Sequence, residues 1–163
     1  MAPLPTQQLR NIRLVISGDI RPWMTKVADL ITRGADPKVL DDWRGEGSII
    51  SFLLYSGMST TKLDVVVPFL LAQGVTASPS LFINCLYRYE HFVYAEMVLA
   101  AIPTFDVNEL VIDDVPIHNW VLKHFARFTD TVKFLKSKGL RVDQPMFSIN
   151  DIIKSRSEER PFA

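Results

Sequence analysis

The feature that most constrains this chain is a helical segment that ends in glycine and recurs along the sequence. Three segments with similar apolar spacing stop at Gly34, Gly74 and Gly139. The residue just beyond a helix often takes a left-handed backbone conformation, which glycine adopts at the lowest cost. A fourth segment, residues 92–101, is followed by Pro103 instead of glycine. Because one helix pair cannot bury its own apolar face, a recurring unit of this kind must stack on its neighbours.

Every predicted element is a helix, and the helices are expected in pairs joined by turns. The apolar periodicity places them at 7–16 and 22–33, at 49–55 and about 63–73, at 81–89 and 92–101, at 115–122 and 129–138, with a last short helix within 146–153. Polar turns separate the pairs at 36–47 and 104–114. We therefore expect an all-α stack of about four helix-turn-helix repeats, an α-solenoid with atypical end units. Residues 1–163 would form a single domain, with 1–6 and 155–163 loosely ordered.

Two parts of this assignment need an argument beyond periodicity. Residues 49–55 are continuously apolar, which suits either a buried strand or a short helix. A strand here would have no parallel partner, whereas a helix would pair with the helix that follows, so we predict a helix. Pro68 falls inside that following helix, where it removes one backbone hydrogen bond. We place the start of this helix close to Leu63, which makes Pro68 its weakest point.

Composition narrows the class of protein. Hydrophobic residues make up 48% of the chain and charged residues 22%, which is typical of a folded protein. The 18 basic residues balance 18 acidic ones, so no field of one sign favours nucleic acid or an anionic membrane. A single cysteine, Cys85, excludes an internal disulfide framework and fits a reducing compartment. Since neither a secretory signal nor a membrane span is evident, we expect a cytoplasmic protein, with the nucleus left open.

The recurring segments share more than their glycines. Residues 132–143 read Val-Lys-Phe-Leu-Lys-Ser-Lys-Gly-Leu-Arg-Val-Asp, and residues 27–38 repeat this ending around Gly-Ala-Asp. Residues 115–120 read Val-Pro-Ile-His-Asn-Trp, which places a proline, an apolar residue and His118 in order. These segments resemble the ankyrin repeat family, in which the second helix ends in V-x-x-L-L-x-x-G-A-x-x-N and the first opens with T-P-L-H-x-A.

The resemblance to ankyrin repeats covers roughly residues 20–143 and is degenerate. Helix ends taken at Gly34, Gly74, Ile102 and Gly139 are 40, 28 and 37 residues apart, near both the ankyrin period of about 33 and the tetratricopeptide period of about 34. The period does not choose between the two families, so the motifs favour ankyrin-like repeats and another stack of α-hairpins is the alternative. Residues 48–53 keep only the general form of the opening motif and not its individual residues. The resemblance implies a protein-protein interaction module that binds through a concave face made by turn tips and first helices. It also implies that His118 is a structural hydrogen-bonding residue between turns.

No motif in the sequence points to catalysis or to a cofactor. His118 and His124 are six residues apart and so lie on different faces of a helix, whereas a metal-binding pair is spaced by three or four. Cys85 lies on an apolar helical stripe, where cysteine packs as a small hydrophobic residue. Residues 45–47, Gly-Glu-Gly, lack the lysine or third glycine of a phosphate-binding loop. We expect no metal, no cofactor and no enzymatic activity; a small enzyme that uses Cys85 or a histidine is the alternative.

The candidate partner-binding residues come from turn tips, first helices and an aromatic link between helices. They are Trp43, Arg44, Glu46, Ser51, Asn84, Tyr87, Asp113, Asp114 and Asn119. Tryptophan and arginine are frequent binding anchors, although Trp43 could instead pack back on its own unit. The acidic turn before His118 either meets a basic partner or is a solvated loop.

The expected partner is a protein, whose identity the sequence does not reveal. No nucleic acid or membrane is expected. The alternative is a structural or assembly domain, which would belong to a larger protein or to a homo-oligomer formed by self-association.

Overall fold

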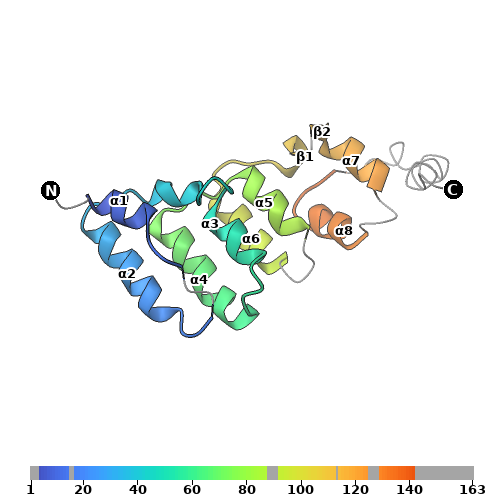
Figure 1. Cartoon of the computed structure of the whole chain (residues 1–163). Coiled ribbons are helices and arrows are strands. Elements are labelled where there is room, and N and C mark those ends of the chain that lie inside the picture. The colour runs from blue at the N-terminus through green and yellow to red at the C-terminus, as the bar shows by residue number, and fades with distance from the viewer. Residues whose placement is uncertain (1–3, 15–16, 88–91, 113, 125–128, 142–163) are drawn as a thin grey trace. The chain divides into compact units, whose positions relative to one another are not determined.

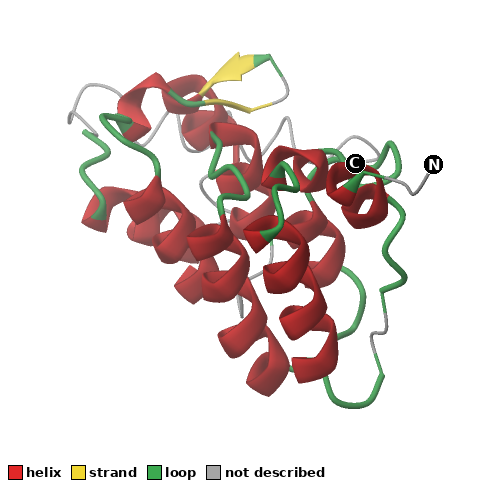
Figure 2. Cartoon of the chain, turned by 90° about the vertical axis from the view of Figure 1, so that its left-hand side faces the viewer, coloured by secondary structure: helices red, strands yellow, loops and turns green. Residues whose placement is uncertain are grey.

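The computed structural model describes residues 4–14, 17–87, 92–112, 114–124 and 129–141 (Figure 1). Helices dominate these residues (Figure 2), which confirms the mostly α-helical class expected from the sequence. The chain divides into two compact units, one formed by residues 1–85 and 93–102 and the other by residues 86–92 and 103–163. The single repeat domain expected over the whole chain stays a prediction.

The first unit is built from six α-helices and a short 3₁₀ helix among its described residues. They are α1 (Pro5–Arg10), α2 (Arg21–Thr32), η1 (Pro37–Asp41), α3 (Ile49–Leu54), α4 (Thr60–Gln73), α5 (Pro79–Leu86) and α6 (Phe92–Ala101). The last residue of α5 and the first of α6 belong to the second unit. The apolar run at 49–55 therefore forms a short helix, as predicted, and the helix expected at 92–101 has those bounds.

Tyr94 on α6 holds that helix against α4. Its side chain is fully buried, and its hydroxyl donates to Asp64 Oδ1 at 2.6 Å and lies 3.3 Å from the carbonyl oxygen of Thr60. Burial, followed by the hydrogen bond to the Asp64 carboxylate, raises the pKa of Tyr94 above its usual value. The phenol therefore keeps the proton that this hydrogen bond needs.

Serine residues cap the start of three helices in the first unit. Their side-chain oxygens accept hydrogen bonds from backbone N–H groups two or three residues later: Ser48 from Ile50 (3.3 Å), Ser59 from Lys62 (3.4 Å) and Ser78 from Leu81 (3.1 Å). Such caps satisfy donors that have no partner within the helix. The N-cap predicted at Ser78 is confirmed.

Three helices, α2, α4 and α8 (Thr129–Ser137) of the second unit, end in the same way. Gly34, Gly74 and Gly139 follow them with φ of 106°, 107° and 104°. The next residue donates its N–H to the carbonyl five positions earlier: Ala35 to Leu30 (2.9 Å), Val75 to Leu70 (3.1 Å) and Leu140 to Leu135 (3.0 Å). All six of these residues are buried. This is the Schellman motif with its accompanying apolar residues, and it confirms that the recurring glycines end helices.

A second hydrogen bond recurs one residue further along each of these endings. The backbone N–H donates to a side-chain oxygen far back in the sequence: Asp36 to Thr6 (3.1 Å), Thr76 to Asp41 (2.7 Å) and Arg141 to Asn108 (2.8 Å). The sequence separations are 30, 35 and 33 residues. Each helix ending is therefore tied to a side chain 30 to 35 residues earlier in the sequence.

The second unit contains the only strands among the described residues. Its elements are η3 (Val107–Glu109), β1 (Val111–Ile112), β2 (Val115–Pro116), α7 (Ile117–His124) and α8. The strands form an antiparallel hairpin in which Val111 faces Pro116 and Ile112 faces Val115. The rings of Phe92 and Phe134 stack with centroids 4.9 Å apart. The sequence had predicted a plain acidic turn here, so the hairpin is an addition to the expected all-α class.

His118 joins two turns of the second unit. Its Nε2 lies 3.2 Å from Asn108 Oδ1 and 3.1 Å from the carbonyl oxygen of Arg141. A carbonyl oxygen only accepts hydrogen bonds, so Nε2 carries the proton. His118 thus has the structural role that the sequence resemblance implied.

Several predicted helix boundaries were wrong; for example, α5 covers Pro79–Leu86 where 81–89 was predicted. α1 ends at Arg10 and not near residue 16, because Ile12 is buried from a non-helical segment and only imitates helical spacing. α7 begins at Ile117, because the two residues before it pair with β1. α4 begins at Thr60, three residues before Leu63, and continues through Pro68.

None of the helices that the structure describes is long and apolar enough to cross a membrane. The short helix predicted within 146–153 lies outside the described residues.

Candidate functional site

A groove in the first unit, called the polar groove here because most residues that line it are polar, includes one of the predicted binding positions, Asn84. It has a volume of about 290 Å³ and lies between the turn before α3, the segment after α4 and α5. The residues that line it are Asp41, Gly47, Ser48, Thr76, Ser78, Ser80, Leu81 and Asn84. Asn84 was predicted from the sequence, and Gly47 follows Glu46 in the predicted turn tip. The groove is therefore the candidate interaction site.

The walls of the groove are held by hydrogen bonds between residues far apart in the sequence. The Asp41 carboxylate accepts from the Thr76 N–H at 2.7 Å and from the Thr76 hydroxyl at 2.5 Å. Lys38 Nζ donates to the same hydroxyl oxygen at 3.1 Å. Asp41 is thus occupied in fixing the groove, which leaves recognition to the neutral polar groups.

Asn84 and Ser51 form a pair behind the groove. Asn84 Nδ2 donates to Ser51 Oγ at 3.0 Å, and the Asn84 backbone carbonyl accepts from the hydroxyl of Tyr55 at 3.0 Å. Ser51 is only 8% exposed. Its prediction as a partner-binding residue was therefore wrong: its hydroxyl orients Asn84. Within the described part of the chain, nothing donates to Asn84 Oδ1, so this oxygen can accept a hydrogen bond from a ligand.

Trp43 is a core residue, which corrects its prediction as an exposed binding anchor. Its side chain is 3% exposed. Its backbone N–H donates to the carbonyl of Gly47 at 2.6 Å and its carbonyl accepts from the N–H of Glu46 at 3.0 Å, which closes the turn over residues 43–47. The polar neighbours in the sequence face solvent while the tryptophan turns inward. The alternative that Trp43 packs back on its own unit is the one observed.

Arg44 and Glu46 are exposed at the tip of this turn. Arg44 has a left-handed φ of 53°, and its guanidinium donates to the carbonyl of Ile12 at 3.3 Å and lies 4.8 Å from the centre of the Trp43 ring. Arg44 therefore covers the buried indole. Glu46 stays available at the surface, so it is the better candidate for partner binding.

The remaining predicted positions belong to the second unit, so the structure does not gather all candidates into one site. Tyr87 is 43% exposed, and Asp114 and Asn119 are also exposed. Asp114 has a left-handed φ of 65°. Asp113 lies outside the described residues. These positions stay predictions.

Of the residues considered for catalysis, Cys85 lies in an environment that suits packing. Cys85 is fully buried on α5, and burial raises the pKa of its thiol to about 12. The thiol is therefore protonated near neutral pH, and a thiol is a poor nucleophile compared with its thiolate. His91 and the side chain of His124 lie outside what the structure describes. Among the described residues, no three His, Cys, Asp or Glu side chains are grouped as metal ligands.

Reasoning from the sequence missed Ser80, Tyr55 and the pair formed by Asp41 and Thr76. Ser80 is exposed at the groove, and Tyr55 is 45% exposed beside Asn84 although it belongs to an apolar run. Asp41 and Thr76 are 35 residues apart. That separation is close to the repeat length predicted from the sequence, which was the one signal that could have linked them.

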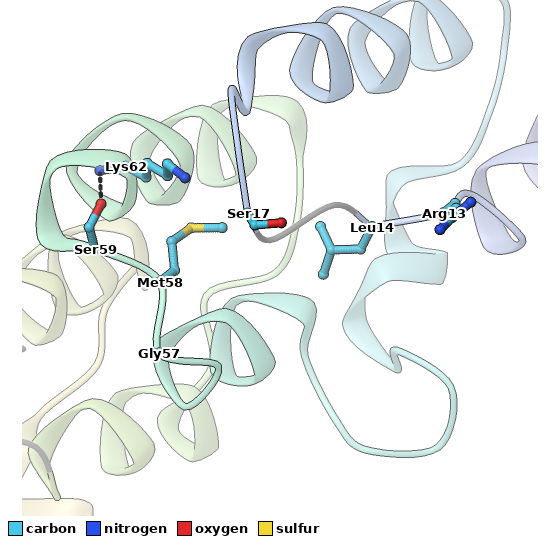
Figure 3. A pocket seen from close by; sticks show the side chains of 7 residues that line it. All are labelled: Arg13, Leu14, Ser17, Gly57, Met58, Ser59 and Lys62. Atoms are coloured by element: carbon cyan, nitrogen blue, oxygen red, sulfur yellow. Dashed lines mark hydrogen bonds between the residues drawn. The ribbon is translucent and has the colours of Figure 1, made fainter.

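Two other cavities lie in the first unit. One, of about 560 Å³, has Arg13 and Lys62 at opposite ends with Met58 between them (Figure 3). The backbone N–H of Lys62 donates to the capping Ser59 at its edge (Figure 3). The other, of about 400 Å³, shares Arg13 and lies beside α2. Neither is lined by a residue that the sequence singled out as partner-binding.

Comparisons of the chain with models of protein families, with curated proteins and with solved structures find no match.

Proposed function

We propose that this chain is a degenerate ankyrin-like repeat protein that binds a protein partner through the polar groove of its first unit. One observation carries the proposal: the groove is lined by residues of a turn tip, such as Gly47, and of the first helix of the next predicted pair, such as Asn84 on α5. Turn tips and first helices are the places where the sequence resemblance puts partner binding.

The two recurring hydrogen bonds support the repeat part of the proposal. Three helices end in the same Schellman motif, and each ending is tied to a side chain 30 to 35 residues earlier. In a stack of repeats, every unit contacts its neighbours through equivalent positions. Equivalent hydrogen bonds at near-equal separations are the pattern that such a stack predicts.

The chemistry of the groove favours a protein ligand over a charged small molecule. Its free groups are neutral, namely the amide oxygen of Asn84 and the hydroxyl of Ser80, and its carboxylate is occupied by Thr76. The amide oxygen of Asn84 can accept a hydrogen bond from a backbone N–H of a peptide, and the hydroxyl of Ser80 can donate one to a backbone C=O. The exposed ring of Tyr55, held by its bond to the Asn84 carbonyl, adds apolar area of the kind that anchors interfaces.

A groove-filling substitution tests this proposal. Ser80→Arg places a long charged side chain at an exposed position of the groove, and we expect it to reduce the amount of captured partner by about tenfold or more, because each buried unpaired charge costs several kcal/mol. The measurement is quantitative mass spectrometry of proteins retained by the immobilised chain from a lysate of its source.

The matched control is Ala72→Arg, which introduces the same side chain at an exposed position of α4 away from the groove. It should retain the same proteins as the wild-type chain. Equal retention by both variants would contradict the groove assignment. A captured species that is the chain itself would instead support the assembly alternative.

A further inference from the structure

The ending of α6 differs from the endings of α2, α4 and α8. Those three helices are followed by glycine residues with φ between 104° and 107°. α6 ends at Ala101, and Pro103 and Thr104 come after it. Here Thr104 takes the left-handed conformation, with φ of 57°. A β-branched residue seldom adopts this conformation, because its side chain crowds the backbone.

Thr104 occupies the position that Gly34 holds after α2. After α2, the Asp36 side chain caps η1 and accepts a hydrogen bond from the backbone N–H two residues later, at 3.0 Å. After α6, the Asp106 side chain caps η3 and accepts the same kind of bond at 2.9 Å. Each aspartate follows its left-handed residue by two positions. The two endings therefore correspond, and a threonine stands where glycine costs least.

The ending of α6 also lacks hydrogen bonds that close the ending of α2. After α2, the N–H of Arg33 donates to the carbonyl four residues earlier at 3.0 Å, and the N–H of Ala35 donates to the carbonyl five residues earlier at 2.9 Å. Pro103 stands in the place of Arg33 and has no N–H to donate. Among the described residues, the N–H of Phe105, in the place of Ala35, donates to no carbonyl of α6. The ending of α6 is therefore both strained and weakly closed.

The division of the chain into two compact units falls at the same place. The last stretch of the first unit ends at Ile102, and the second unit continues from Pro103. Within the second unit, α7 contacts η3 and both strands, and the ring of Phe92 stacks on that of Phe134. A region with internal packing of its own can open while the rest of a protein stays folded.

We propose that Pro103 and Thr104 form the point at which the second unit opens as one cooperative unit while the first unit stays folded. The strain at Thr104 exists only while the ending of α6 is formed, so opening releases it. The polar groove is lined by residues of the first unit. It therefore stays formed in the open state, and this proposal does not rest on the function of the groove.

Native-state hydrogen exchange of the full chain, followed by NMR, tests this proposal. In the wild-type chain, we expect the slowest amides of α7 and α8 to share one protection factor, about tenfold or more below that of the slowest amides of α2 and α4. Thr104→Gly removes the strain and should raise the protection of α7 and α8 alike by about twofold to tenfold, because the cost of a left-handed side chain exceeds the flexibility that glycine adds to the open state. The protection of α2 and α4 should not change.

The matched control is Thr104→Ala, which removes the threonine side chain but keeps the cost of the left-handed conformation. It should change the protection of α7 and α8 by less than about twofold. The proposal is overturned if α2, α4, α7 and α8 share one protection factor in the wild-type chain, since the units would then open together. It is also overturned if Thr104→Gly protects only the amides next to it, or if Thr104→Ala protects α7 and α8 as strongly as Thr104→Gly does.

Discussion

Replacing Trp43 with alanine should lower the free energy of unfolding by about 3–5 kcal/mol, the usual cost of removing a buried aromatic side chain. The indole is 3% exposed and lies under a closed turn. Its removal would leave a cavity that the turn cannot fill without breaking the hydrogen bonds between Trp43, Glu46 and Gly47. Because stabilities of single domains are only about 5–15 kcal/mol in total, this is the largest effect expected from one substitution in the turn.

Urea unfolding followed by circular dichroism measures this loss. Trp43→Phe keeps an aromatic ring in place and should cost less than the alanine variant. Glu46→Ala, at the exposed tip of the same turn, should change stability by no more than about 0.5 kcal/mol. If Trp43→Ala cost as little as Glu46→Ala, the indole would not be part of the core and its role as an exposed anchor would return.

The second large loss of stability is expected when Gly74 is replaced by alanine. With φ of 107°, an alanine here takes a left-handed conformation, which costs about 1–2 kcal/mol. Its Cβ would also lie 2.9 Å from Pro37 Cγ and 3.4 Å from Pro37 Cβ. Overpacking of this kind typically adds about 1–3 kcal/mol. We therefore expect Gly74→Ala to destabilise the protein by about 2–5 kcal/mol in total.

Gly34 provides a control for the steric part of this effect. It follows α2 in the same Schellman motif with φ of 106°, but an added Cβ would meet nothing within 4 Å. Gly34→Ala should therefore show the conformational cost alone, about 1–2 kcal/mol. Comparing the thermal unfolding of Gly74→Ala and Gly34→Ala separates the steric cost from the conformational cost. Equal losses would mean that Pro37 moves aside freely, and the close packing of η1 on the end of α4 would be contradicted.

The sequence predicted the helix endings well because their cause is local. A left-handed residue after a helix favours glycine wherever the helix lies, so Gly34, Gly74 and Gly139 were informative without knowledge of the fold. The serine cap at Ser78 was predictable for the same reason. The helix expected at 7–16 failed because Ile12 is buried without being helical, and apolar spacing records burial whatever the backbone conformation.

The candidate site could be predicted only in part because its residues meet through long-range packing. Asn84 and Glu46 were identified by their place in a first helix and a turn tip. Whether Trp43 is buried or exposed depends on a turn that folds its indole inward. A polar stretch of sequence does not reveal such a turn. Ser80 carries no signal of its own, because a serine near a helix start is usually read as a cap. Its place at the groove follows from where α5 lies relative to the turn before α3.

Site-specific photo-crosslinking tests the central claim, recognition of a protein through the polar groove, most directly. Benzoylphenylalanine is placed at position 46, on the exposed turn tip next to the groove residue Gly47, or at position 72 on the exposed surface of α4, and the chain is irradiated in a lysate of its source. The groove proposal predicts a discrete adduct from position 46 alone, which disappears with excess wild-type chain but persists with excess Ser80→Arg. An adduct that forms equally from both positions, or that both competitors remove, would contradict it.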